Sequence, residues 1–327
     1  KKFKLRNGVE VPFIGFGTGI VRKYSRKPSV FIHGRIRPVL SAIKHASFTR
    51  LYQILQQDFF MGKVIDTAIS EGYTLLDSGR IYGYSEVEYG KAIVRNNLPR
   101  EDIFVTTKVS DMDLYRDGSP NDVAGNLQLS LKYLQLDFVD AYLLHWPHGN
   151  WLDIYKQMEN AYNKGLVRSI GVCNFHLEHF KQLEANCSIM PMIHQTELHP
   201  LNSKKVIRDY CKEHGILIMA HTPTGRMSPA IRNNAVLQKI AKKYGKTIAQ
   251  VIVRWHYQNG VVPIIATKSR AHMKENKDIF DFALTEEDTT RIDSIDQGEV
   301  MLPGNGVDDP RSVSYTHLRA HETRHDL

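Results

Sequence analysis

Residues 72–83 read GYTLLDSGRIYG, and they place two proton-bearing side chains directly after a short apolar run. Asp77 ends that run, and Tyr82 follows five residues later. Two further apolar runs along the chain also end in ionisable side chains, Lys108 and His145. Ionisable groups at the carboxyl ends of successive parallel strands meet at one mouth of a barrel. The sequence therefore predicts that these four side chains share one site.

The composition is that of a globular enzyme. The chain has 327 residues, of which 42% are hydrophobic and 24% charged, so one large α/β domain or two smaller domains are allowed. The three cysteines Cys173, Cys187 and Cys211 form no C-x-x-C motif, which argues against a disulfide framework or a bound metal. We expect a cytoplasmic protein. No apolar run approaches the roughly 18–20 residues of a membrane span, so no membrane partner is expected.

The positive charge is concentrated in one segment. Residues 21–62 hold eight basic residues and one acidic residue, which together carry +7 of the formal net charge of +8. We interpret this segment as a basic insert after the first barrel strand, most simply a solvated surface loop with a short helix. A lid over the substrate is the functional alternative, and a basic helix touching a membrane or nucleic acid is disfavoured. No nucleic-acid partner is predicted.

The remaining chain alternates between strand and helix patterns. An N-terminal hairpin is predicted from Lys2–Arg6 and Val9–Phe13 around the Asn7-Gly8 turn. The expected strands are Phe13–Gly17, Tyr73–Asp77, Ile103–Lys108, Phe138–His145, Val167–Val172, Met192–Glu197, Ile216–Ala220 and Val261–Thr267. The expected helices are Lys63–Ser70, Ser85–Asn96, Ala124–Leu134, Leu152–Lys164, Leu177–Ala185, Ser203–His214 and Ala235–Trp255.

Eight strands alternating with helices favour a closed (β/α)8 TIM barrel, with an open doubly wound sheet as the alternative. We assign residues 1–313 to this single domain. The tail at 314–327, SYTHLRAHETRHDL, has no apolar periodicity and no metal-binding spacing, and we interpret it as non-native sequence.

Asp, Tyr, Lys and His at one barrel mouth suit the reduction of a carbonyl. Such a reduction needs a hydride donor, an acid for the oxygen and groups that orient that oxygen. Tyr82 is the candidate acid, and a neighbouring Lys108 ammonium would favour its phenolate. Asp77 would hold Lys108, and His145 would orient the substrate oxygen. Because no side chain donates hydride, a nicotinamide cofactor is required.

Four segments of the chain carry a resemblance to the aldo-keto reductase family. They are GYTLLDSGRIYGYSEVEYGKAI at 72–93, MENAYNKGLVRSIGVCNF at 158–175, His194–Pro200, and residues 265–276. The chain is most similar to the branch of 2,5-diketo-gluconate reductases and glyoxal reductases. The resemblance implies a barrel that binds NADP(H) without a dinucleotide-binding fold, and the sequence indeed lacks G-x-G-x-x-G. The Tyr-x-x-x-Lys pair of short-chain dehydrogenases is also absent.

The resemblance also implies site residues beyond the catalytic four. Trp146 would join Tyr82 and His145 in contacting the substrate, and no residue would bind metal. The implied cofactor-binding residues are Gly17, Thr18, Cys173, Asn174, Gln195, His221, Thr222, Thr267, Lys268, Arg270, His272, Glu275 and Asn276.

Several positions depart from the family pattern. Cys173 stands where Ser is commoner, and His221 where a Tyr usually stacks on the nicotinamide. Thr267 and His272 occupy positions of the family's Ser and Arg near the adenosine 2′-phosphate, so two cations of the pattern, a Lys and this Arg, are missing. Lys268 and Arg270 could compensate. NADP(H) is favoured as the cofactor, and NAD(H) is the rival.

The predicted activity is NAD(P)H-dependent reduction of small aldehydes or ketones. Gly19 replaces a bulky aromatic common in the family after the first strand, which predicts a wider pocket mouth. The alternative is a cofactor-binding regulatory or interaction protein on the same barrel with little turnover. A third alternative, that the insert and tail reflect sequence error, predicts a poorly folding chain. The family is mostly monomeric, and we expect a monomer.

Overall fold

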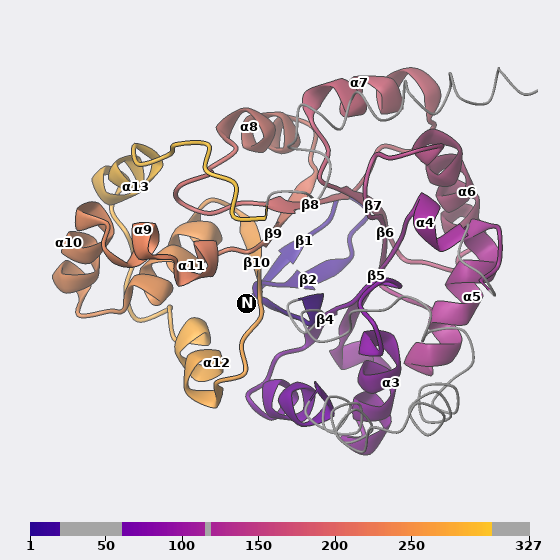
Figure 1. The fold of residues 1–327 in the computed structure, drawn as a ribbon, viewed down its shortest axis with the longest axis horizontal. Helices are drawn as coiled ribbons and strands as arrows, with labels where there is room; N and C mark the ends of the chain where they lie inside the picture. The colour runs from indigo at the N-terminus through magenta and orange to yellow at the C-terminus, as the bar shows by residue number, and fades with distance from the viewer. Residues whose placement is uncertain (20–60, 115–118, 303–327) are drawn as a thin grey trace, which may run out of the picture.

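The structure, a computed structural model, describes residues 1–19, 61–114 and 119–302 and contains a closed barrel of parallel strands (Figure 1). Each strand pairs with its neighbours in chain order, and the last closes onto the first. The strands are β3 (Gly15–Gly17), β4 (Leu75–Asp77), β5 (Phe104–Val109), β6 (Ala141–Leu144), β7 (Ile170–Cys173), β8 (Ile193–Glu197), β9 (Leu217–His221) and β10 (Val261–Ile265). The predicted (β/α)8 barrel is confirmed.

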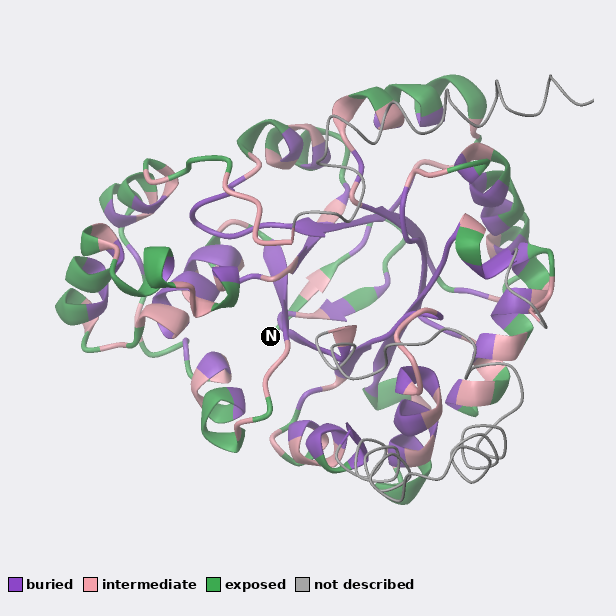
Figure 2. Cartoon of the chain, in the orientation of Figure 1, coloured by how far each residue is buried: buried purple, intermediate pink, exposed green. Residues whose placement is uncertain are grey.

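Helices surround the barrel, with their buried faces toward the strands and exposed faces outward (Figure 2). Residues 61–70 are helical. The longer helices that follow are α3 (Ser85–Arg95), α5 (Val123–Leu134), α6 (Trp151–Asn163), α7 (Leu177–Asn186), α8 (Lys205–Glu213), α10 (Ala235–Tyr244), α11 (Ile248–Gln258), α12 (Arg270–Lys277) and α13 (Glu286–Asp293). Shorter turns of helix are η3 (Arg100–Asp102), α4 (Asp111–Leu114), η4 (Gly225–Met227) and α9 (Pro229–Arg232).

The prediction of one helix over Ala235–Trp255 is wrong. Gly245 ends α10 in the left-handed conformation, with φ of 62°. Thr247 then caps α11, because its side chain accepts the Gln250 N–H while the Gln250 side chain returns to the Thr247 backbone. The Gly-Lys-Thr break therefore divides an apolar pattern that looked continuous.

The side chains inside the barrel are apolar at one end of its axis and polar at the other. On β4, Leu75 faces inward, Leu76 packs among the residues between barrel and helices, and Asp77 faces inward again. The inward residues near the strand starts are apolar, whereas those near the strand ends include Asp77, Lys108 and Gln195. The same alternation therefore builds an apolar floor and a polar mouth.

The predicted hairpin is confirmed and seals the floor. β1 (Lys2–Lys4) pairs antiparallel with β2 (Glu10–Pro12). Leu5, Val9 and Val11 pack against apolar residues at the bottom of the barrel, including Leu75 and Phe104. Burial of such side chains is the main stabilising contribution to a core.

The insert predicted at 21–62 lies outside the described residues except for positions 61 and 62, which are helical. The tail predicted at 314–327 lies wholly outside them.

Candidate active site

The structure brings the four predicted catalytic side chains together at the barrel mouth. Asp77 ends β4, Lys108 lies near the end of β5, and His145 directly follows β6. Tyr82 lies on the loop between β4 and α3. Parallel pairing sets Asp77 opposite Thr106, so Lys108 projects from the next inward position of the neighbouring strand.

Asp77 and Lys108 form a buried ion pair. Lys108 Nζ donates to both Asp77 carboxylate oxygens at 2.8 Å and to the Ser78 carbonyl at 2.6 Å. Asp77 Oδ1 also accepts from Thr106 Oγ1 at 2.5 Å and from Gln195 Nε2 at 2.9 Å. These additional bonds compensate for the cost of removing two charges from water. Burial is the largest single effect and lowers the pKa of Lys108, but the charge and hydrogen bond of Asp77, together with the ionisable groups of Tyr82 and Cys173, outweigh it and leave the pKa above its ordinary value. Lys108 is therefore an ammonium at neutral pH.

Tyr82 lies over this pair with its hydroxyl facing His145. Its Oη is 3.2 Å from His145 Nε2, and Lys108 Nζ is 4.9 Å from the centre of its ring. Burial raises the pKa of Tyr82 to about 12, although the Lys108 charge acts in the opposite direction. Lys108 thus favours the phenolate, as expected from the sequence, but burial is the larger effect. Tyr82 is a protonated hydroxyl at neutral pH and can donate.

Stacking and a backbone contact fix the orientation of His145. Its ring lies parallel to that of Trp146, with centroids 3.7 Å apart and an interplanar angle of 3°. Asn174 Nδ2 donates to the His145 carbonyl at 3.2 Å. Trp146 itself is 6% exposed and lines the cavity described next.

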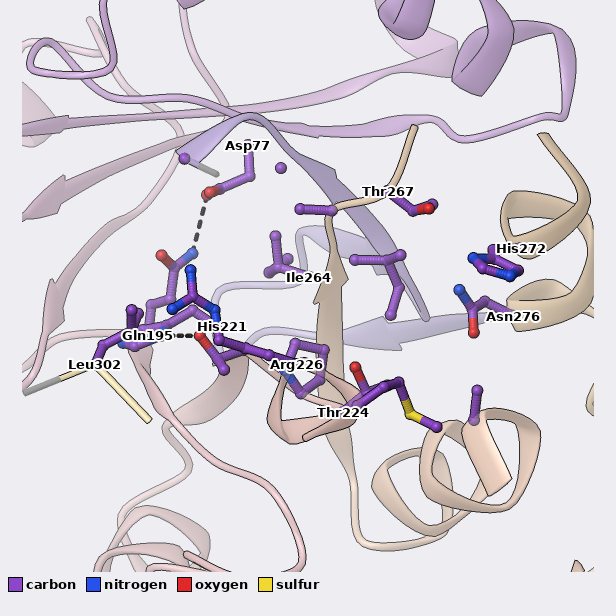
Figure 3. A pocket seen from close by; sticks show the side chains of 18 of the residues that line it. Asp77, Gln195, His221, Thr224, Arg226, Ile264, Thr267, His272, Asn276 and Leu302 are labelled. Atoms are coloured by element: carbon purple, nitrogen blue, oxygen red, sulfur yellow. Dashed lines mark hydrogen bonds between the residues drawn. The ribbon is translucent and has the colours of Figure 1, made fainter. Parts of the chain in front are cut away.

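A cavity of about 880 Å³ is lined by Tyr82 and His145 and, from α12, by His272, Glu275 and Asn276. Figure 3 shows Asp77, Gln195 and His221 at one end and Thr267, His272 and Asn276 at the other. Of the predicted cofactor-binding residues, the structure places in the cavity wall Gly17, Asn174, Gln195, His221, Thr222, Thr267, His272, Glu275 and Asn276.

The other four predicted cofactor residues do not line the cavity. Thr18 is buried and hydrogen-bonds Ser85 Oγ. Cys173 ends β7 inside the barrel, where burial raises the pKa of its thiol to about 12. Lys268 is exposed, and Arg270 forms an exposed ion pair with Glu71.

His221 does more than fill the position of a stacking aromatic. Its Nε2 is 3.0 Å from Asn174 Oδ1, and its Nδ1 is 3.3 Å from Thr222 Oγ1. Asn174 and Thr222 both have positive φ, at 59° and 55°. These left-handed turns after β7 and β9 direct the three side chains to one wall of the cavity.

Sequence reasoning missed two arginines of the cavity wall. Arg226 and Arg232 come from the segment between β9 and α10, beside Thr224 and Met227. Neither takes part in an ion pair with another residue in the described ranges. No motif marked them, and the only signal available was their position just after the seventh barrel strand.

The cavity fits a dinucleotide with several phosphates. Arg226 and Arg232 supply positive charge along its wall. Two buried polar atoms of the wall, Trp146 Nε1 and Asn276 Oδ1, have no hydrogen-bond partner among the described residues. Buried polar groups are normally paired, so these atoms point to a polar ligand. Within the same residues, no cluster of His, Cys, Asp or Glu is arranged to hold a metal ion.

Comparison with known proteins agrees with this geometry. The profile of the Aldo/keto reductase family matches residues 58–297. The chain is 39% identical over 232 residues to the 9,11-endoperoxide prostaglandin H2 reductase of Trypanosoma cruzi, covering 70% of this chain and 80% of that protein. It is 39% identical over 240 residues to the glyoxal reductase of Bacillus subtilis, covering 73% and 84%.

A solved structure with a similar fold is the Bombyx mori aldo-keto reductase AKR2E4 in complex with NADP. It superposes with a TM-score of 0.75 at 27% identity and covers 94% of this chain and 97% of its own. The chain belongs to the aldo/keto reductase family.

Proposed function

We propose that this protein uses NADPH to reduce small aldehydes and ketones to alcohols, with Tyr82 as the general acid. Family membership makes it an NADP(H)-dependent oxidoreductase that acts on carbonyl groups. One observation supports the residue roles above all others: Tyr82 Oη lies 3.2 Å from His145 Nε2, directly above the buried Asp77–Lys108 pair.

The cofactor supplies the hydride, and the protein supplies the proton and the orientation. A carbonyl oxygen between Tyr82 Oη and His145 Nε2 can accept a hydrogen bond from each. Tyr82 then protonates that oxygen as negative charge develops. The phenolate that remains faces the Lys108 ammonium, which Asp77 holds in place.

The cofactor's position follows from the cavity wall. Asn174, Gln195 and His221 would hold the nicotinamide end near Tyr82, and Glu275 and Asn276 the adenine end. Arg226 and Arg232 would face the phosphates between them. For the 2′-phosphate, Lys268 and Arg270 remain the candidate cations, since an exposed ion pair such as Arg270–Glu71 is weak and can open.

The substrate class is a small carbonyl compound. The relatives include glyoxal and methylglyoxal reductases, which supports a reactive dicarbonyl as a substrate. Trp146 and Gly19 line the cavity near Tyr82, and Gly19 contributes no side chain to its wall.

A spectrophotometric assay of NADPH oxidation tests the proposal directly. The purified protein should oxidise NADPH in the presence of methylglyoxal, and Tyr82→Phe should lower kcat by about 10²- to 10⁴-fold, the usual contribution of general acid catalysis. The affinity of Tyr82→Phe for NADPH, measured by fluorescence, should stay unchanged. This control would show that the variant is folded. Full turnover by Tyr82→Phe would disprove the role of Tyr82.

We further propose a cytoplasmic monomer with residues 1–313 as one domain. Cys173, Cys187 and Cys211 are all free thiols, which supports a reducing compartment. The large apolar side chains exposed among the described residues are scattered over separate elements, which supports a monomer; they are Val94, Met112, Val206 and Phe280. Within those ranges no helix has the length and apolar character to cross a bilayer. Light scattering after size exclusion tests the monomer.

A further inference from the structure

The described end of the chain runs along the loop that follows β8. Ser203 Oγ donates to Asp296 Oδ2 at 2.5 Å. Closer to the barrel, the Leu201 carbonyl accepts the backbone N–H groups of Gln297 and Glu299, at 3.1 and 2.9 Å. These contacts guide the segment after α13 back toward the barrel mouth.

The last of these contacts is made by Glu197, the final residue of β8. Its Oε1 accepts the Met301 N–H at 2.6 Å, and its Oε2 the Leu302 N–H at 3.3 Å. Its side chain is on the same side of β8 as that of Gln195, two residues earlier, which reaches Asp77. One carboxylate at the barrel rim therefore holds two successive backbone groups of the C-terminal segment.

Glu197 is well prepared to be a fixed acceptor. It is 3% exposed, and its Oε1 also lies 3.0 Å from Nε2 of the fully buried His199. Burial raises the pKa of Glu197, but the hydrogen bonds from His199 and from the Met301 N–H together bring it below the ordinary value. The group is thus a carboxylate at neutral pH, and its hydrogen bonds are of the strong, charge-assisted kind.

Leu302 connects this anchor to the cavity. Its side chain lines the cavity that holds Tyr82 and His145. Figure 3 shows it beside Gln195 and His221, at the end of the cavity opposite His272. The backbone group of Leu302 is the one that Glu197 holds, so the position of this apolar wall depends on that carboxylate.

We infer that Glu197 is a positioning residue for substrate selection: it fixes Leu302 as one wall of the substrate pocket and so restricts the size of the carbonyl compound that is reduced. This inference rests on the proposed reductase function. Glu197 does not touch the reacting atoms and acts through Leu302. Its loss frees two N–H groups, lets Leu302 move away and widens the pocket for bulky carbonyls.

A double-mutant cycle tests the connection. The measured quantity is the ratio of kcat/KM for methylglyoxal to kcat/KM for para-nitrobenzaldehyde, in the full-length protein. Leu302→Ala should lower this ratio about tenfold, the scale expected when a few methyl groups leave an apolar pocket. Glu197→Gln keeps the shape but not the charge, and it should lower the ratio several-fold, mainly through a smaller KM for the bulky aldehyde.

The effects of the two substitutions on this ratio should not be additive. If Glu197 acts through Leu302, Glu197→Gln has no further effect on the ratio in the Leu302→Ala background. A purely structural role of Glu197 predicts equal losses of turnover with both aldehydes and an unchanged ratio. An unchanged ratio in either single variant, or full additivity in the double variant, overturns the inference. If Glu197→Gln does not fold, Glu197→Asp, which withdraws the carboxylate by one methylene, should give the same change in the ratio.

Ser203→Ala is the matched control. It removes a hydrogen bond of the same segment at Asp296 and should leave the ratio unchanged within twofold. NADPH affinity should also stay within twofold in every variant. Turnover of neither aldehyde by the unmodified protein would instead refute the proposed function, which distinguishes that failure from failure of the inference.

Discussion

Arg270, the first residue of α12, forms an ion pair with Glu71, which lies almost two hundred residues earlier, just after the helical residues 61–70. Arg270 is 73% exposed and Glu71 14% exposed. The guanidinium that is a candidate partner for the cofactor's 2′-phosphate is therefore already paired with a carboxylate. If Arg270 binds the 2′-phosphate as proposed, NADPH has to compete with Glu71 for this guanidinium.

This competition gives a prediction for cofactor choice. Glu71→Gln removes the competing charge and should tighten NADPH binding a few-fold, because an exposed ion pair contributes about 0–1 kcal/mol. Arg270→Gln should weaken NADPH binding. Binding of NADH, which has no 2′-phosphate, should change in neither variant, as measured by fluorescence titration. Equal effects on the two cofactors would exclude Arg270 from the 2′-phosphate.

The buried Asp77–Lys108 pair predicts opposite results for stability and for activity. Lys108→Met leaves the Asp77 charge buried and should lower the free energy of unfolding by about 3–5 kcal/mol. The double variant Asp77→Leu/Lys108→Met leaves no unpaired charge buried, so it should regain most of the lost free energy of unfolding. Urea unfolding measures both. The double variant should nevertheless remain inactive, and recovered turnover would show that Lys108 is dispensable.

Two buried histidines predict that acid destabilises the fold. Burial lowers the pKa values of His194 and His256 to about 3, from 6.5. Both are neutral in the folded protein and become protonated on unfolding at mildly acidic pH. The two neutral histidines therefore contribute to the free energy of unfolding above pH 6.5. This contribution is lost as the pH falls from 6.5 toward about 3.

Between pH 7 and pH 5 the loss should be roughly 2 kcal/mol for each histidine. Urea unfolding at the two pH values measures it. His194→Gln, which cannot take up a proton, should show a smaller difference between the two pH values. An identical difference in the variant would exclude His194 as a contributor.

Gly19 predicts a change in substrate size selection. A Cβ atom at this position would lie 3.4 Å from Tyr82 Cζ, which is ordinary contact, so a Cβ atom fits without displacing the tyrosine. Gly19→Trp should narrow the cavity mouth and favour methylglyoxal over bulky aromatic aldehydes by about tenfold in kcat/KM. Gly19→Ala is the control and should change little. No gain in selectivity for small substrates would count against an open mouth at Gly19.

The meeting of the four candidate side chains at one barrel mouth could be predicted from the sequence, because local patterns determine it. Asp77, Lys108 and His145 each end or follow an apolar run, and parallel strands bring such positions to one mouth. The sequence also contains a signal for the helix break, a glycine at position 245. The apolar pattern continues on both sides of it, so the pattern alone predicted one helix.

Other parts of the site depend on the paths of loops, which no local pattern specifies. Arg226 reaches the cavity because it and Met227 adopt positive φ, at 55° and 47°. Leu302 reaches it because Glu197, more than a hundred residues earlier, holds its backbone. The pairing of Arg270 with Glu71 likewise follows from the closure of the barrel.

The apolar floor beneath the candidate active site favours one direction for the supply of protons. Leu5, Val9 and Val11 of the hairpin seal the end of the barrel below Asp77 and Lys108, and the cluster they join is made of hydrophobic residues. In the proposed mechanism, a proton that Tyr82 gives to the substrate is therefore replaced from the polar side, where Tyr82 faces His145, Lys108 and the cavity. Because the alcohol product would occupy that side, we expect its release to precede the reprotonation of Tyr82 from solvent.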